Sequence, residues 1–326
     1  MSASEERRDS WSRYWAGGAL HSCATSFDGN YDDAIGEFWR AVGATLTGSE
    51  RVLDVATGNG ALPRFLVDTL GSAGRLPEVD AVDLANIAPT WVQQLPPAQA
   101  DRLRFHPRVA VESLPFADAH FDLVISQYGL EYSELDRSVD ELLRVMQPGA
   151  KVALVLHHLD SLPVRLGRAE VVEIDWLLQA GGLLQKAKRL LPYLARLATP
   201  AGMASVQRDP EAAKARGYYN EALRELQGRA GSTDASDVLF ETQAAVGELM
   251  QRVAGSGAAA AQAQLDGVRD GLRLGRLRQA ELVAHALDAA AVERLGHRFA
   301  VRDRLRWEIG ELRVRGELFG WSLRTI

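Results

Sequence analysis

Seven consecutive residues, from Asp54 to Gly60, combine an acidic side chain with glycines at a spacing that suits a bound ligand. Asp54 lies in an apolar, strand-like run, and the glycines precede a segment of helical spacing. Glycine tolerates the backbone angles of a tight turn and lets a ligand approach the main chain closely. The helix that follows directs its unpaired N–H groups at that ligand. We therefore expect a ligand contact from most of this segment, namely Asp54, Ala56, Thr57, Gly58, Asn59 and Gly60.

The same segment departs from the glycine pattern of dinucleotide-binding enzymes. In G-x-G-x-x-G the pyrophosphate sits at the start of the helix, and the third glycine allows close packing of helix and strand. Here the third position is Pro63, and the acidic Asp54 precedes the glycines. An acid placed ahead of the glycines favours a ligand with a cationic ammonium and sulfonium over a diphosphate.

A second acidic residue, Asp83, ends the next strand-like run. It follows the glycine turn by about 20 residues, the distance at which an acid can accept hydrogen bonds from ribose hydroxyls. A single Asp at a strand end is usually a turn or cap residue. In combination with the glycine turn, we expect Asp83 to bind a ribose.

These residues are placed by an alternation of short β-rich runs and helical segments. Apolar strands separated by helices are typical of a parallel sheet buried on both faces. The patterns predict strands over 51–56, 79–84, 103–111, 121–126 and 151–157, and helices over 31–46, 62–70, 87–95 and 135–146. The expected fold class is α/β.

Five segments in order resemble the class I S-adenosylmethionine-dependent methyltransferases, especially the branch of ubiquinone and menaquinone C-methyltransferases. Together they span about a third of the chain, and they are Val52–Gly60, Ala81–Leu84, Glu112–Ala117, Phe121–Ser126 and Leu142–Gly149. The resemblance implies a Rossmann-like sheet of seven mostly parallel strands, with an antiparallel last strand. It also implies S-adenosylmethionine as the cofactor and methyl transfer to a small molecule, with O-, N- or C-methylation left open.

The resemblance assigns roles along the cofactor. The turn from Thr57 to Gly60 would hold the methionine part, with Asp54 near its amino group and Gln127 at the same end. Asp83 would hold the ribose, and Leu84 would pack on the adenine. The acid that contacts adenine in the family falls at Ala110, followed by Val111, so that acid is missing here. Adenine would then be held by the Val111 backbone, by packing, or by Glu112.

Four regions follow from these patterns. We expect 1–50 to be a helical segment that covers cofactor and substrate, and 51–159 to be the cofactor-binding core. The region 160–285 should be a helical insertion that serves as a substrate cap or a dimer element, with breaks at 200–203 and 228–236. The region 286–326 should add a helix and a β-hairpin, with strands over 300–308 and 318–325, that complete the sheet.

Methyl transfer needs a base only when the acceptor must lose a proton. His157 and His158 end the fifth strand, at the edge where open α/β sheets bind ligands. Because adjacent strand residues face opposite ways, we expect at most one of them at the site. Glu131 and Tyr132 are further candidates. In the N-terminal segment, aromatic side chains including Tyr14 could cover the cofactor and stabilise a sulfonium; the others are Trp15, Phe27 and Tyr31, beside His21.

Composition restricts the partners. The net charge of −6 argues against a nucleic acid, which needs clustered Lys and Arg. The single cysteine, Cys23, and the lack of a Cys/His set or acidic cluster predict no metal site. No apolar run is long enough for a membrane span, and the polar N-terminus does not match a signal peptide, so we expect a cytoplasmic protein. A small acceptor of lipophilic character and a homodimer are the expected partners.

Two other functions remain open at this stage. A member of this fold without catalysis could act through the insertion as an interaction protein, which the missing acid at Ala110 favours. A nicotinamide-dependent oxidoreductase is the other, and the missing third glycine argues against it.

Overall fold

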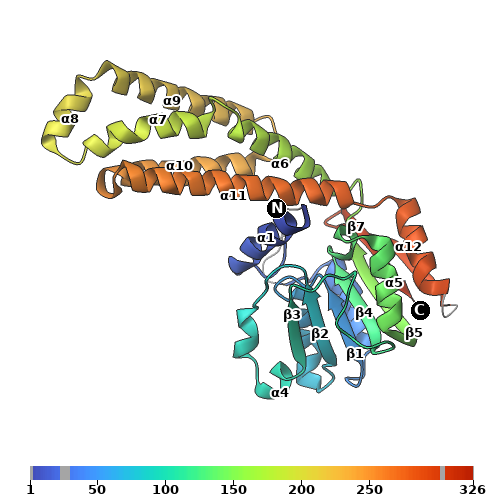
Figure 1. Cartoon of the computed structure of the whole chain (residues 1–326). Coiled ribbons are helices and arrows are strands. Elements are labelled where there is room, and N and C mark those ends of the chain that lie inside the picture. Colours follow the sequence, from blue (N-terminus) through green and yellow to red (C-terminus); the bar gives the residue numbers. More distant parts are fainter. Residues whose placement is uncertain (1–2, 23–29, 302–304, 326) are drawn as a thin grey trace. The chain divides into compact units, whose positions relative to one another are not determined.

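The computed structural model describes residues 3–22, 30–301 and 305–325, so Cys23 and Phe27 lie outside the described residues. The chain forms two compact units (Figure 1). Unit 1 consists of Met1–Val164 and Glu281–Ile326, and unit 2 of Arg165–Ala280. The expected insertion, 160–285, extends five residues beyond unit 2 at each end. The regions expected at 1–50, 51–159 and 286–326 all fall within unit 1.

Unit 1 is built on one sheet in which the strand order is β3-β2-β1-β4-β5-β7-β6. Five strands are parallel, and β7 pairs antiparallel with both β5 and β6. The strands are β1 (Arg51–Val55), β2 (Glu78–Asp83), β3 (Leu103–Pro107), β4 (Phe121–Gln127), β5 (Met146–Leu156), β6 (Trp307–Val314) and β7 (Glu317–Thr325). The predicted Rossmann-like sheet, with its antiparallel last strand, is confirmed.

Alternation along the strands explains why helices cover both faces of the sheet. Val52 belongs to one apolar core and its neighbour Leu53 to the other, because successive side chains point to opposite faces. The core around Val52 includes side chains of α2 (Ala34–Ala44) and α3 (Ala61–Leu70). The core around Leu53 includes side chains of α5 (Leu135–Val145) and α12 (Ala289–Val301). The carboxyl ends of β1, β2 and β4 therefore meet at one edge, between two helical layers.

Shorter elements connect these layers. The N-terminal helix α1 (Ala3–Ala16) precedes α2, whose first turn is capped by the Asp33 carboxylate accepting from the Ile35 N–H at 2.9 Å. The remaining short helices of unit 1 are η1 (Gly71–Ala73), η2 (Thr90–Gln94), α4 (Pro97–Ala100) and η3 (Leu130–Tyr132).

Three local predictions were wrong. The helix expected over 87–95 is only the 3-10 turn η2, which begins after Pro89, a residue held in an extended conformation. The strand expected over 103–111 ends at Pro107, because Arg108 adopts a positive φ of 61° and turns the chain. The strand expected over 300–308 is displaced, since α12 continues to Val301 and β6 begins at Trp307.

The end of β6 matches a two-residue hairpin. Arg315 and Gly316 both have positive φ, 52° and 86°, which is the geometry of the turns that join right-twisted antiparallel strands. The predicted hairpin is confirmed, with Val314 paired to Glu317.

Unit 2 is entirely helical in its described residues. It contains most of α6 (Leu162–Leu178) and α11 (Ala258–His285), with α7 (Leu183–Arg196), α8 (Pro200–Gln207), α9 (Pro210–Ala230) and α10 (Ser236–Ser256) between them. A separate apolar core, which includes Leu191, Leu226 and Leu239, holds these helices together. The break expected at 200–203 is instead the first turn of α8, because Pro200 suits that position and the Thr199 hydroxyl accepts from the Gly202 N–H.

No helix within the described residues is both long enough and apolar enough to cross a membrane.

Candidate functional site

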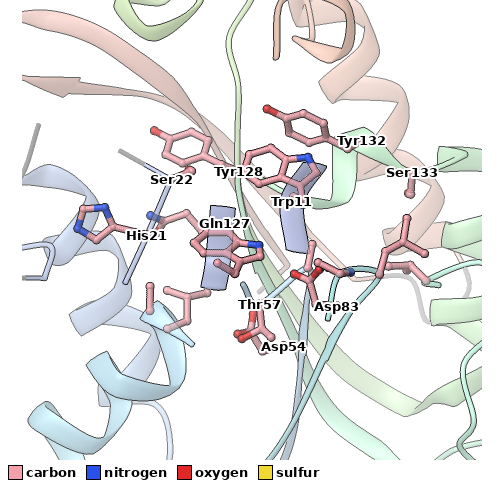
Figure 2. A pocket seen from close by; sticks show the side chains of 18 of the residues that line it. Trp11, His21, Ser22, Asp54, Thr57, Asp83, Gln127, Tyr128, Tyr132 and Ser133 are labelled. Atoms are coloured by element: carbon pink, nitrogen blue, oxygen red, sulfur yellow. The ribbon is translucent and has the colours of Figure 1, made fainter. Parts of the chain in front are cut away.

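A pocket in unit 1 lies at the carboxyl edge of the sheet and collects residues from all three strand ends (Figure 2). Nine of the predicted cofactor residues line it: Asp54, Ala56, Thr57, Asp83, Leu84, Ala110, Val111, Glu112, and Gln127 at the end of β4. Helix α1 contributes Arg7, Arg8, Trp11 and Trp15. In Figure 2, Trp11, Tyr128 and Tyr132 lie on the side opposite Asp54 and Thr57.

The residue that follows each of two strands beside the pocket has a positive φ. Ala56 follows β1 with φ 55°, and Tyr128 follows β4 with φ 53°. Non-glycine residues rarely adopt a positive φ, and such conformations cluster at ligand sites. Gly129 packs so closely on Ala56 that a β-carbon at Gly129 would lie 2.4 Å from the Ala56 β-carbon. The two strand ends thus form one tight pocket floor.

Asp54 is a buried carboxylate with unused bonding capacity. Its side chain is 1% exposed, and its Oδ2 has no hydrogen-bond partner within the described residues. Burial raises the pKa of Asp54 to about 8; the Thr57 hydroxyl nearby lowers it, and the Asp83 charge adds to the rise. The Thr57 hydroxyl itself falls outside hydrogen-bond geometry with any described residue. A cationic group placed here would satisfy a buried acid.

Gln127 offers the opposite polarity. Its Oε1 accepts a hydrogen bond of 2.5 Å from the Trp39 indole N–H, while its Nε2 is buried without a partner in the described part of the chain. In addition to the Thr57 hydroxyl, the pocket therefore contains a buried acceptor at Asp54 and a buried donor at Gln127 that no described residue pairs. Unpaired buried polar atoms are unfavourable, and a ligand that satisfies both would be stabilised.

Asp83 stabilises the turn as well as facing the pocket. Its Oδ2 accepts from the Gly58 N–H at 2.8 Å, and its Oδ1 accepts from the Ala85 N–H at 2.7 Å. Burial raises the pKa of Asp83 to about 6, although both backbone bonds lower it. Each carboxylate oxygen accepts one backbone bond and keeps a lone pair that a ligand in the same pocket can use.

The glycines of the turn have a structural role that the sequence alone did not show. Gly58 and Gly60 do not line the pocket. A β-carbon on Gly58 would lie 2.5 Å from the Trp15 ring, and one on Gly60 would lie 2.8 Å from the Phe105 ring and 3.1 Å from Trp91. Aromatic side chains of the protein, rather than a ligand, occupy the space that these glycines leave.

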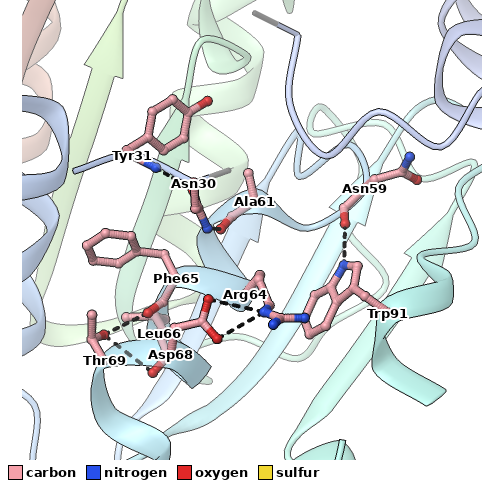
Figure 3. A network of polar contacts seen from close by, with 10 residues as sticks. All are labelled: Asn30, Tyr31, Asn59, Ala61, Arg64, Phe65, Leu66, Asp68, Thr69 and Trp91. Carbon is pink, nitrogen blue, oxygen red and sulfur yellow. Dashed lines mark hydrogen bonds and ion pairs between the residues drawn. The ribbon is translucent and has the colours of Figure 1, made fainter. Parts of the chain in front are cut away.

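Asn59 does not line the pocket either, and its side chain forms hydrogen bonds with the N-terminal segment. Its Nδ2 donates to the carbonyl oxygens of Trp15 at 2.9 Å and Ala19 at 2.7 Å. Its own carbonyl accepts from the Trp91 indole N–H at 2.8 Å (Figure 3). Asn59 therefore joins α1 to the glycine turn.

The start of α3 is fixed by neighbouring polar contacts. The Asn30 side chain donates to the Ala61 carbonyl at 3.0 Å, and Arg64 pairs with Asp68 one turn along the helix (Figure 3). Gly60 caps α3 without a side-chain bond, and Ala61 lines the pocket. The unpaired N–H groups of the first turn of α3 favour an anion there.

Helix α1 forms one wall of the pocket. Arg7 donates to the Tyr132 carbonyl at 2.7 Å and pairs with Glu281, and the Ser12 hydroxyl accepts from the Asn86 N–H at 2.8 Å. Of the predicted N-terminal residues, Trp15, His21 and Tyr31 line the pocket, whereas Tyr14 does not, and its hydroxyl donates to the His21 carbonyl. Sequence reasoning missed Arg7 and Trp11, although Arg7, Trp11 and Trp15 recur every four residues, the spacing of one helix face.

Neither predicted histidine lines the pocket. His157 is 2% exposed, and its Nδ1 lies 2.7 Å from Glu131 Oε1, which also accepts from the His157 backbone N–H. The ring centroids of Tyr128 and Tyr132, which do line the pocket, lie 4.3 and 5.8 Å from that of His157. Glu131 and His157 thus form a buried pair behind the tyrosines.

His158 has different surroundings. Its ring stacks on Trp321 with centroids 4.2 Å apart, and its Nδ1 accepts from the Asp160 N–H. Burial lowers the pKa of His158. These contacts account for the position of the His158 ring without a ligand, so its role is in packing.

Comparison with known proteins connects this site to one family. Residues 52–149 match the model of a methyltransferase domain. A 2-phytyl-1,4-naphtoquinone methyltransferase of Trichormus variabilis is 34% identical over 127 residues, which cover 37% of this chain and 53% of that protein. The ubiquinone/menaquinone biosynthesis C-methyltransferase of Ectopseudomonas mendocina is 26% identical over 54% of this chain and 71% of its own length. The chain thus spans about half the length of the first of these relatives.

Two solved structures resemble the chain at lower sequence identity. An S-adenosylmethionine-dependent methyltransferase from Mesorhizobium loti is 19% identical, with a TM-score of 0.33 over 42% of this chain and 57% of its own. The [4+2]-cyclase SpnF is 22% identical, with a TM-score of 0.37 over 49% of this chain and 62% of its own.

Proposed function

We propose that the chain, whose residues 52–149 match the model of a methyltransferase domain, is a class I S-adenosylmethionine-dependent methyltransferase that transfers a methyl group from this cofactor to a small-molecule acceptor. The observation that carries the proposal is the pair of buried, unpaired polar atoms in one pocket, Asp54 Oδ2 and Gln127 Nε2. An acceptor and a donor, with Asp83 in the same pocket, match the ammonium, the carboxylate and the ribose of this cofactor.

Four predicted cofactor residues that line the pocket have these roles in the proposal. Asp54 would accept from the ammonium and Asp83 from the ribose, while Leu84 and Val111 supply apolar surface for the adenine. Glu112 is the acid in the adenine region, but its Oε1 already accepts from the Glu134 N–H at 2.9 Å. We therefore favour packing and the Val111 backbone for adenine over a Glu112 contact.

When bound, the cofactor supplies an electrophilic methyl group on its sulfonium. The chain must bring an acceptor to that group and exclude water. The aromatic side chains on the far side of the pocket from Asp54, namely Trp11, Tyr128 and Tyr132, favour a planar, apolar acceptor. The curated relatives are named for quinone compounds, which supports a lipophilic acceptor of that kind.

For an acceptor that must lose a proton, we propose His157 as the base. Glu131 fixes the ring through Nδ1, so that Nε2 is the nitrogen left to take the proton, and the carboxylate stabilises the resulting imidazolium. Because Tyr128 and Tyr132 separate His157 from the pocket, this role requires the acceptor to extend past them.

The role of unit 2 also belongs to the proposal. Its apolar core and helical content support the expected insertion as a substrate cap or as the contact of a homodimer, and a cytoplasmic location fits the sequence. Sedimentation of the full chain with and without cofactor would distinguish a dimer from a monomer.

Calorimetry with S-adenosylmethionine, S-adenosylhomocysteine and NAD tests the proposal. We expect both sulfur nucleotides to bind and NAD to fail. Binding of NAD alone would favour the oxidoreductase, and no binding would favour the interaction protein. Methyl transfer is then measured with labelled cofactor across hydroquinones, phenols and amines; cofactor binding without transfer to any of them would also favour the non-catalytic function.

A further inference from the structure

A buried indole controls which way the Gln127 side chain faces. Trp39 lies on α2, is 1% exposed, and belongs to the apolar core on the α2–α3 face of the sheet. Its Nε1 donates to Gln127 Oε1 at 2.5 Å. Trp39 and Gln127 are 88 residues apart in the chain, and the contact joins the helical layer to the carboxyl end of β4.

The chemistry of the indole leaves only one orientation of the amide. A Trp N–H can donate but cannot accept, whereas the two ends of a Gln amide differ, one accepting and one donating. Turning the amide over would place its NH₂ against the indole N–H. Trp39 therefore holds the amide oxygen, and the NH₂ group is the end that remains buried and unpaired in the described chain.

The unpaired NH₂ lies on the same face of the sheet as Asp54. Asp54 pairs with Ile125 across β1 and β4, and Gln127 follows Ile125 by two residues, which returns it to the same face. Both residues line the pocket. An acceptor and a donor thus stand side by side on neighbouring strands, the polarity needed for the ammonium and carboxylate of an amino acid.

We propose that Trp39 is a positioning residue that makes Gln127 a carboxylate donor, so that the site selects a ligand with an intact amino-acid end. Without the indole, the amide can turn its oxygen toward the carboxylate, where two acceptors repel. The inference rests on the proposed function. It states that Trp39, a residue outside the pocket, determines how strongly the site prefers the cofactor over a nucleoside thioether that lacks the amino-acid end.

Two ligands separate this role from simple packing. S-adenosylhomocysteine carries the amino-acid end, whereas 5′-methylthioadenosine keeps the nucleoside and the sulfur and lacks that end. In Trp39→Phe we expect the affinity for S-adenosylhomocysteine to fall roughly tenfold, the effect of one lost hydrogen bond to a charged group. The affinity for 5′-methylthioadenosine should stay within about twofold, and its binding also shows that the variant folds.

Val42→Ala is the matched control, since Val42 lies on the same buried side of α2 and belongs to the same core but has no contact with the amide. It should change the two affinities equally. Gln127→Leu should reproduce the selective loss, and the double variant with Trp39→Phe should lose little more than either one, because both changes remove the same contact.

Gln127→Glu gives an independent test that leaves Trp39 in place. One carboxylate oxygen accepts from the indole and the other faces the ligand, so S-adenosylhomocysteine should be rejected more strongly than 5′-methylthioadenosine. Equal losses for both ligands in Trp39→Phe, or additive losses in the double variant, would overturn the inference while the proposed function stands. Failure of the unaltered protein to bind either ligand would instead overturn the proposed function, and the inference with it.

Discussion

Asp54→Asn tests whether the buried carboxylate binds the cofactor's ammonium, and its effect should depend on pH. Because burial raises the pKa of Asp54 to about 8, the carboxyl is mostly neutral at pH 6 and must lose its proton when a cation binds. Each pH unit below 8 then weakens binding by about tenfold, since one pKa unit corresponds to roughly 1.4 kcal/mol. Between pH 6 and pH 9, this effect amounts to about a hundredfold in affinity.

The asparagine variant removes the titration as well as the charge. Above pH 8 it should bind S-adenosylhomocysteine more weakly than the unaltered protein by about 1.5–3 kcal/mol, the contribution of a hydrogen bond to a charged group. At pH 6 the two proteins should differ far less. Isothermal titration between pH 6 and 8.5, in buffers of different ionisation enthalpy, should find about one proton released per ligand near pH 6.5 for the unaltered protein alone.

Stability provides a second readout of the same group. The folded-state pKa of Asp54 lies above its ordinary value of 3.8, so between pH 4 and 8 the folded chain holds a proton that the unfolded chain has already lost. Asp54 therefore decreases the stability of the ligand-free protein as pH rises through that window, and Asp54→Asn should lack the decrease. Parallel pH profiles of affinity and melting temperature in the two proteins would refute the assignment of Asp54 to the ammonium.

Three further changes address other parts of the site. Asn59→Ala removes both bonds that hold the end of α1, so residues 3–22 should exchange amide hydrogens faster and cofactor affinity should fall by about 1–2 kcal/mol; unaltered exchange would exclude Asn59 as the fastening residue. Gly58→Ala combines a positive φ with a clash against Trp15 and should lower the free energy of unfolding by about 1–3 kcal/mol, measured by urea denaturation; no loss would show that Trp15 packs elsewhere. Glu131→Gln should reduce kcat by about 10- to 100-fold with cofactor affinity unchanged, for an acceptor that loses a proton. An unaltered kcat would remove His157 from the chemistry.

The strands and their order in the chain could be predicted because local sequence determines them. The runs at 51–55 and 121–127 are apolar and β-branched, and each lies within a residue or two of the predicted range. The antiparallel end of the sheet followed from the family resemblance. The displaced β6 shows the limit, since the helical spacing of α12 continues to Val301 before any strand begins.

The residues at the strand ends of the pocket could be predicted, and those of the N-terminal segment only in part. Asp54, Asp83 and Gln127 stand at strand ends, where the fold itself brings ligand contacts together, so a position along the chain was enough. Gly58 and Gly60 were assigned to the ligand because the sequence shows only that they lack side chains. The rings that fill the space beside them belong to Trp15 and Phe105, which lie in distant segments of the chain. The polarity of Gln127 likewise depends on Trp39, a contact that no local pattern encodes.

The two segments of unit 1 that flank unit 2 in the chain lie side by side, which has a consequence for how the protein can be altered. Leu287 donates its N–H to the His157 carbonyl at 2.9 Å, and its own carbonyl accepts from the Leu159 N–H at 3.0 Å. The Trp321 indole N–H donates to the same carbonyl. Backbone hydrogen bonds within unit 1 thus join the two chain segments that flank unit 2, and unit 2 has a core of its own.

A connection closed in this way does not require an insertion of particular length, because the entropy of loop closure grows only slowly with the number of residues. Exchange of 165–280 for another helical bundle, or for a short linker, should leave the sheet able to form. Substrate choice in such a scaffold could then change by replacement of one unit, without any change in the residues at the strand ends.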